Sequence, residues 1–166
     1  MFFSGKDKYE TSGLLGAAQQ QIITDLENLY VSKTGADVIL QSGDCEFPAH
    51  KALLIARSPV FASMFKHSTT KESMEGRVVI KDVSAKVLQL LLAFLYTGLV
   101  NLEGDEELTV ELLAAADKYE VDSLKAICSE QLAAGLSAQS MFATLHIAEL
   151  YSVPELKSKV VDFIAK

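Results

Sequence analysis

The chain has 166 residues, 49% of them hydrophobic, which is typical of one globular domain and not of a disordered chain. Its 15 basic and 22 acidic residues give a formal net charge of −7, which argues against a nucleic-acid partner. The most apolar run, residues 87–96, is too short to span a membrane. We therefore expect a soluble protein with no nucleic-acid or membrane partner.

Residues 1–20 carry three glycines, scattered charges and few side chains that a core would bury, so we predict a flexible leader there. Ile22, Leu26 and Leu29 then follow at i, i+4 and i+7, which is the spacing of one helical face. Because this apolar stripe is narrow, the predicted short helix must lie against another surface.

Two strand-like runs come next, at residues 37–40 and 45–47, and the intervening Gly and Asp suit a turn. These residues predict a β-hairpin over 37–49. Cys45 in this hairpin and the distant Cys128 lie in patterns of a buried strand and a buried helix. Reduced, buried thiols favour a reducing compartment, and we expect the protein in the nucleus, the cytoplasm or both.

A break at Ser58-Pro59 divides the following segment into two predicted helices. The first covers residues 51–57. Ser58 suits the N-cap of the second, and Pro59 suits its first turn, where a missing N–H costs nothing. A third strand is predicted at residues 77–80.

The most apolar helix is predicted over residues 85–96, with Ser84 as its N-cap and Gly98 at its end. Apolar side chains cover nearly all of its sides, so it is expected at the centre of the core. Residues 99–102 are expected to form a brief edge strand. The acidic turn at residues 103–107 favours the start of the next helix through the helix dipole.

The last sixty residues contain an internal repeat, because residues 113–132 align with residues 145–164 at an offset of 32. Each copy predicts a helical hairpin, with turns at 120–122 and 152–154. Two copies are fewer than a solenoid needs, so we expect the second hairpin to extend the domain. Seven aligned pairs carry the repeat: Leu113 and Leu145, Ala116 and Ala148, Tyr119 and Tyr151, Val121 and Val153, Leu124 and Leu156, Lys125 and Lys157, Leu132 and Ile164.

The sequence contains no recognisable catalytic or metal-binding motif. None of its three histidines has a second histidine or a cysteine at i+3 or i+4 on a helix, and Ser58 does not lie in a G-x-S-x-G motif. We interpret His50 as a turn histidine whose ring satisfies a backbone group. The chain is therefore predicted to be no enzyme and to hold no cofactor or metal, the alternative being a hydrolase that uses Ser58 and His50.

Four motifs in this order resemble a BTB/POZ domain, and within that family the speckle-type POZ subfamily. They are ADVIL at 36–40, FPAHKALLIARSPVFASMF at 47–65, FLYTG at 94–98 and LLAAADKY at 112–119. The resemblance covers about residues 22–166. It implies an α+β fold in which a small, mostly three-stranded sheet caps a helical cluster. The expected domains are the leader at 1–20, the BTB/POZ domain at 21–136 and, at 137–166, the helical hairpin found in cullin-binding relatives.

The resemblance implies a homodimer that recruits the third cullin scaffold of a ubiquitin ligase, with substrates bound through domains not in this chain. The alternative is a BTB oligomerisation module of a transcription factor or scaffold without cullin binding. The implied dimer contacts are Ile22, Leu26, Leu29 and Leu53, together with a charged pocket formed by Asp37 and Lys51.

The implied cullin contacts include the segment Thr70-Lys71-Glu72. Relatives place an apolar residue, any residue and a glutamate there, so Thr70 replaces the apolar anchor. Loss of such an anchor weakens binding by on the order of tenfold. Further contacts are expected at Phe65 and Tyr119.

Overall fold

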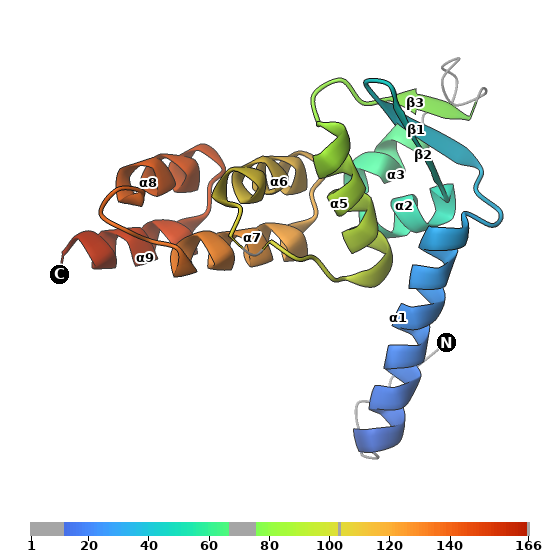
Figure 1. The fold of residues 1–166 in the computed structure, drawn as a ribbon, viewed down its shortest axis with the longest axis horizontal. Helices are drawn as coiled ribbons and strands as arrows, with labels where there is room; N and C mark the ends of the chain where they lie inside the picture. The colour runs from blue at the N-terminus through green and yellow to red at the C-terminus, as the bar shows by residue number, and fades with distance from the viewer. Residues whose placement is uncertain (1–11, 67–75, 103, 166) are drawn as a thin grey trace.

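The computed structural model describes residues 12–66, 76–102 and 104–165. A small sheet caps one end of a helical cluster, one long helix projects from it, and two helical hairpins extend on the other side (Figure 1). This arrangement is the α+β fold that the sequence predicted. No helix in the described ranges is both long and apolar enough to cross a bilayer.

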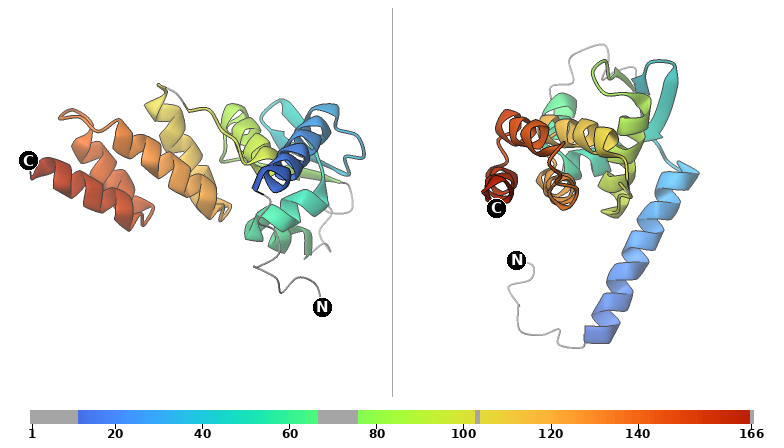
Figure 2. Two further views of the ribbon diagram at one scale, coloured as in Figure 1. Left: turned by 90° about the horizontal axis from the view of Figure 1, so that it is seen from below. Right: turned by 60° about the vertical axis from the view of Figure 1, so that its left-hand side comes forward.

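The projecting helix α1 (Ser12–Ser32) begins well before Ile22, so residues 12–20 are helical and do not belong to a structureless leader. Alanine and glutamine, which are frequent in this part, have high helix propensity. The expectation failed because it considered only burial, and a helix does not need burial over its whole length. The remaining residues of the predicted leader lie outside the described residues. Figure 2 shows the N-terminal part of α1 projecting away from the other helices, while its C-terminal end meets the domain.

The sheet consists of β1 (Val38–Ser42), β2 (Cys45–Ala49) and β3 (Arg77–Val79), in the order β2-β1-β3. The first two strands form the predicted antiparallel hairpin, in which Gly43 takes a positive φ of 56° at the turn. The third strand pairs with β1 in parallel.

The two cysteines differ in their surroundings. Cys45 is exposed at the tip of the hairpin and not buried as predicted, because it directly follows the turn on β2, which is an edge strand of the sheet. Cys128 is buried as predicted, and burial raises the pKa of its thiol to about 12. Its thiol therefore behaves as a small apolar group.

Helices α2 (Lys51–Arg57) and α3 (Pro59–Lys66) meet at Ser58, as the sequence predicted. The buried Ser58 Oγ accepts a hydrogen bond of 3.2 Å from the Phe61 amide and donates one of 2.6 Å to the Tyr119 carbonyl. One hydroxyl thus caps α3 and connects it to a segment that lies far away in the sequence.

Helix α5 (Ala85–Thr97) lies at the centre of the core and is capped as predicted. The Ser84 hydroxyl accepts from the Val87 amide, and Gly98 ends the helix with a φ of 70°. Residues 99–102 form no strand, contrary to expectation, since none of the described strands lies beside them; Leu102 is instead buried. The helix has these buried residues: Val87, Leu88, Leu91, Leu92, Phe94, Leu95 and Tyr96.

The predicted repeat is confirmed by helices α6 (Glu106–Lys118), α7 (Asp122–Ala134), α8 (Met141–Leu150) and α9 (Pro154–Ile164). Glu120 and Ser152 occupy equivalent turns, and both have a φ of 52°. The two hairpins also repeat an ion pair. Its atoms are Lys125 Nζ and Asp117 Oδ1 at 2.6 Å in the first hairpin, and Lys157 Nζ and Glu149 Oε1 at 2.9 Å in the second.

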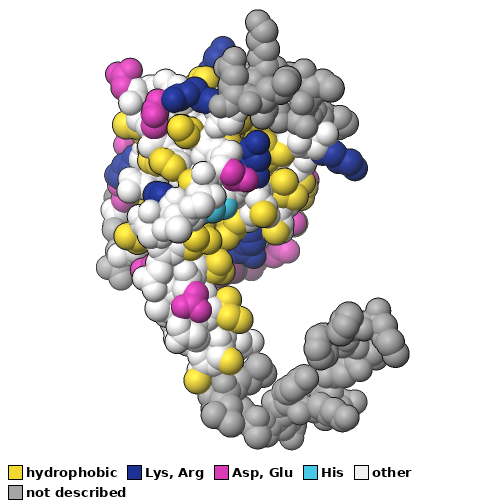
Figure 3. All heavy atoms as spheres, turned by 90° about the vertical axis from the view of Figure 1, so that its right-hand side faces the viewer, with side chains coloured by type: hydrophobic (Ala, Val, Ile, Leu, Met, Phe, Trp, Pro, Cys, Tyr) yellow, Lys and Arg dark blue, Asp and Glu magenta, His cyan; other side chains and the backbone are white. Residues whose placement is uncertain are grey.

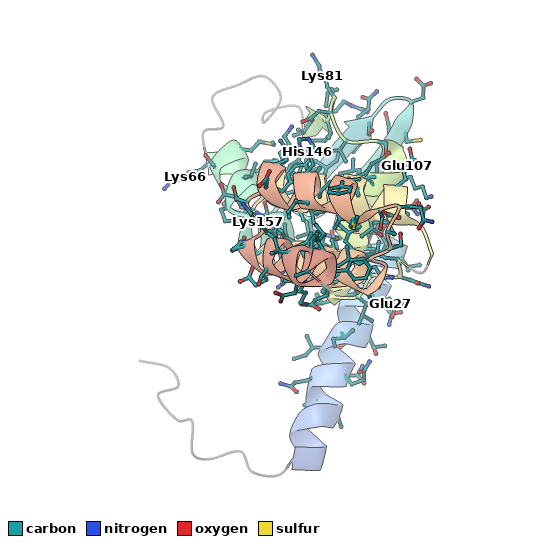
Figure 4. All side chains as sticks on the ribbon, turned by 90° about the vertical axis from the view of Figure 1, so that its left-hand side faces the viewer. Glu27, Lys66, Lys81, Glu107, His146 and Lys157 are labelled. Carbon is teal, nitrogen blue, oxygen red and sulfur yellow. The ribbon has the colours of Figure 1, made fainter. Side chains whose placement is uncertain are left out.

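The second hairpin lies on the outside of the first, with α9 packed against α7. Figure 4 views the molecule from this end, where His146 and Lys157 mark α8 and α9. The burial of equivalent residues differs accordingly: Leu132 is buried, whereas 43% of its counterpart Ile164 is exposed. The second hairpin therefore packs on the outside of the first, and its assignment as an extension of the domain stays a prediction.

We expect Ser58→Ala to lower the free energy of unfolding by about 2 kcal/mol, because it leaves a buried amide and a buried carbonyl without a partner. Urea denaturation measures the change. Ser63→Ala is the matched control, because Ser63 is exposed on α3, and it should change the free energy by less than about 0.5 kcal/mol. Equal effects of the two substitutions would contradict the role assigned to the Ser58 hydroxyl.

Candidate interaction surface

The predicted dimer residues lie on α1 and α2, except Asp37, which directly precedes β1. The side chain of Ile22 is 58% exposed, and Leu26, Leu29 and Leu53 are half-buried. Leu53 packs against the core, and so does Tyr30 of α1. Helix α1 packs mainly along α5, and this contact lies close to the C-terminal end of α1. Apolar side chains continue from α1 onto the neighbouring surface of the domain (Figure 3).

Asp37 and Lys51 interact within one chain through the backbone of Lys51, and their charged pocket at a dimer interface stays a prediction. The backbone amide of Lys51 donates a hydrogen bond of 2.8 Å to Asp37 Oδ1. The Lys51 ammonium instead lies 5.8 Å from the centre of the Phe65 ring. Because Lys51 is the first residue of α2, its amide has no partner within the helix, and the Asp37 carboxylate supplies one. Asp37 therefore acts as a cap for α2.

His50 joins three segments of the chain. Its Nε2 lies 2.8 Å from the Thr34 carbonyl oxygen, and its Nδ1 lies 2.6 Å from the Tyr96 hydroxyl. Its backbone amide donates to the same hydroxyl at 3.0 Å. The interpretation of His50 as a turn histidine that satisfies a backbone group is confirmed. The hydroxyl of Ser58 donates to a carbonyl and not to this imidazole, so the geometry of a Ser–His hydrolase is not formed.

Two of the predicted cullin contacts are buried. The side chain of Tyr119 is 2% exposed and that of Phe65 is 8% exposed. Both pack beside Phe61, whose ring centroid lies 4.7 Å from that of Tyr119 and 6.1 Å from that of Phe65. These rings hold α3 against the turn between α6 and α7, and their contact with a cullin stays a prediction. Thr70 and Glu72 lie outside the described residues.

The structure also contains a groove of about 380 Å³ that the sequence patterns did not reveal. It lies where the loop before α5, the outer face of α6 and Tyr151 at the end of α8 meet. Lys118 and Asp82 form an ion pair at this groove. Its lining comes from segments far apart in the sequence, so no local pattern could identify it. The lining residues are Asp82, Val83, Ser84, Val87, Glu111, Ala114, Ala115, Asp117, Lys118 and Tyr151.

Comparisons with known proteins agree with this architecture. The family model described as the BTB/POZ domain matches residues 26–136. Among solved structures, the BTB domain of zebrafish PATZ1 is similar, with a TM-score of 0.60 and 29% sequence identity. The match covers 70% of this chain and 92% of that chain. The family model spans well over half of the sequence, and the order of strands and helices agrees with it. The chain therefore belongs to the BTB/POZ family.

Proposed function

We propose that this BTB/POZ domain forms a homodimer and recruits the third cullin scaffold of a ubiquitin ligase, while other domains bind the substrates. A BTB/POZ domain is a protein interaction module, and this coarser function follows from the family. Dimerisation and binding of the cullin scaffold go beyond this coarser function, and each rests on an observation of its own. We further propose that the protein acts in the nucleus, the cytoplasm or both.

The observation that supports the homodimer is the apolar stripe on α1. Ile22 is largely exposed, and Leu26 and Leu29 are only half-buried and do not pack against the buried core. In proteins, most of the stability of a helix comes from packing of its apolar side, and the apolar side of α1 (Ser12–Ser32) is only partly covered by its own chain. A second copy provides an identical stripe, and an isologous interface buries both stripes together.

The cullin contact is supported by the resemblance to the speckle-type POZ subfamily and by the position of the second hairpin. This hairpin packs directly on the domain and shares the groove beside Tyr151 with it. The surface available to a large scaffold therefore includes both parts of the chain.

The alternative is a BTB oligomerisation module of a transcription factor or scaffold that does not bind cullin. The burial of Phe65 and Tyr119 favours this alternative, because it leaves little of either ring available to a partner. Thr70 favours it as well, because threonine stands at the position of an apolar anchor.

We expect Leu26→Asp to weaken the dimer by at least about tenfold, because it places a charge in the apolar interface twice. Sedimentation equilibrium measures the dissociation constant. Asn28→Asp is the matched control, because it adds the same charge to an exposed position of α1 away from the stripe. A monomeric wild type at micromolar concentration, or equal weakening by both substitutions, would refute the proposed interface.

We expect the N-terminal region of the third cullin to bind the wild type at concentrations on the order of tens of micromolar. Thr70→Met should strengthen this binding about tenfold by restoring an apolar anchor. Calorimetric titration measures both affinities, and Thr69→Met adds the same side chain one position earlier as a control. If an intact dimer does not bind, the alternative function is correct; if both substitutions strengthen binding equally, the contact has been assigned to the wrong residue.

A further inference from the structure

We propose that His50 is a positioning residue: protonated only at Nε2, it holds the end of α1 on the domain, and protonation at Nδ1 releases this hold. The inference concerns the orientation of α1 within one chain. Its consequence for assembly rests on the proposed homodimer, in which α1 carries the shared stripe.

The segment that His50 holds is the turn that connects α1 to β1. The helix ends at Ser32, and the chain then changes direction through Lys33 and Gly35, with φ values of 57° and 76°. Thr34 lies between these two left-handed residues, and its carbonyl faces Nε2 of His50 at 2.8 Å. A group that binds Thr34 therefore acts at the place where the direction of α1 is set.

The neighbours of the imidazole decide which nitrogen carries the proton. A carbonyl oxygen only accepts hydrogen bonds, so Nε2 must carry the hydrogen that the Thr34 carbonyl accepts. The Nδ1 atom of the neutral ring then accepts from the Tyr96 hydroxyl at 2.6 Å. The hydroxyl oxygen in turn accepts the His50 backbone amide at 3.0 Å, so every donor and acceptor in this group is satisfied.

A second proton on the imidazole leaves one donor of this hydrogen-bonded group without an acceptor. Protonated Nδ1 becomes a donor that faces the Tyr96 oxygen, which already accepts the backbone amide. The hydroxyl hydrogen then needs a new acceptor. Tyr96 is only 3% exposed, and among the hydrogen bonds of the described residues Nδ1 is the acceptor of its hydroxyl. Either the imidazole or the tyrosine must move, and movement of the imidazole breaks the hydrogen bond to Thr34.

Titratable and charged groups lie around Tyr96, whose ring centroid is 5.8 Å from that of His50. The Tyr30 and Tyr96 rings lie 5.2 Å apart, and the Lys33 ammonium lies 3.6 Å from the Tyr30 centroid. Burial raises the pKa of Tyr96, so its hydroxyl remains a donor at neutral pH. The Asp37 carboxylate contributes to the same rise in the pKa of Tyr96, and the ammonium of Lys51 lies toward the Phe65 ring.

Nuclear magnetic resonance of the imidazole nitrogens tests the first half of the proposal. In the wild type at high pH, we expect a hydrogen on Nε2 and a bare Nδ1. The same resonances report directly when His50 becomes protonated as the pH is lowered. A neutral ring with its hydrogen on Nδ1 would overturn the assignment.

A distance between spin labels tests the second half. One label is placed on the exposed Cys45 of β2 and the other on Glu27→Cys, an exposed position of α1. Cys128 is buried, so it remains unlabelled. An excess of unlabelled chain removes distances between subunits, so the readout does not depend on dimerisation. We expect one narrow distance distribution while His50 is neutral, and a shifted or broadened one when His50 is protonated.

His50→Gln provides the decisive comparison, because a glutamine amide can donate to the Thr34 carbonyl but does not titrate. In this variant we expect the narrow distribution at every pH, and dimer affinity that no longer changes as the pH is lowered. His67→Gln and His146→Gln are the controls and should respond to pH as the wild type does. The proposal fails if the distance in His50→Gln changes with pH as it does in the wild type. It also fails if the distance changes with pH in neither protein. If the chain is a monomer and still shows the expected distances, the proposed homodimer is wrong and the role of His50 stands.

Discussion

The packing of the domain depends on one buried hydroxyl. Ser58 Oγ connects the amide of Phe61 at the start of α3 to the carbonyl of Tyr119 at the end of α6. The Phe61 and Tyr119 rings stack directly beside this contact. A buried hydroxyl with two partners specifies one geometry, whereas apolar contacts alone tolerate small displacements. Helices α3 and α6 are therefore held in one arrangement.

A second constraint acts on the other side of the domain, where α1 leaves it. The helix is anchored near its C-terminal end, through Tyr30 on α5 and through His50 on the following turn. Its remaining length presents an apolar stripe that the chain itself does not cover completely. A helix held at one end and apolar along one side is suited to packing against another subunit, and its direction decides whether two stripes meet.

The second hairpin shows how a repeat changes its role with position. Both copies keep the same turn and the same ion pair, but the first is enclosed between the core and the second. Local sequence preserves the hairpin, and the neighbours decide how much of each face is buried. For this reason Leu132 belongs to the core, while the equivalent Ile164 lies at the surface.

The sequence by itself determined the features that depend on neighbours along the chain: the hairpin, the capping by Ser58 and Ser84, the end of α5 at Gly98, the repeat and the resemblance to the BTB/POZ family. It also identified the stripe on α1 and the role of His50 as a turn residue. These were predictable because spacing and capping are local properties.

Only the tertiary structure decided the features that arise between distant segments. It placed Cys45 at the surface, turned Asp37 into a cap for α2, and buried Phe65 and Tyr119 between helices. It also showed that Tyr96 and Thr34 are the partners of His50. The physical reason is that burial and hydrogen-bond partners depend on which segments meet in space, and no local spacing encodes that meeting.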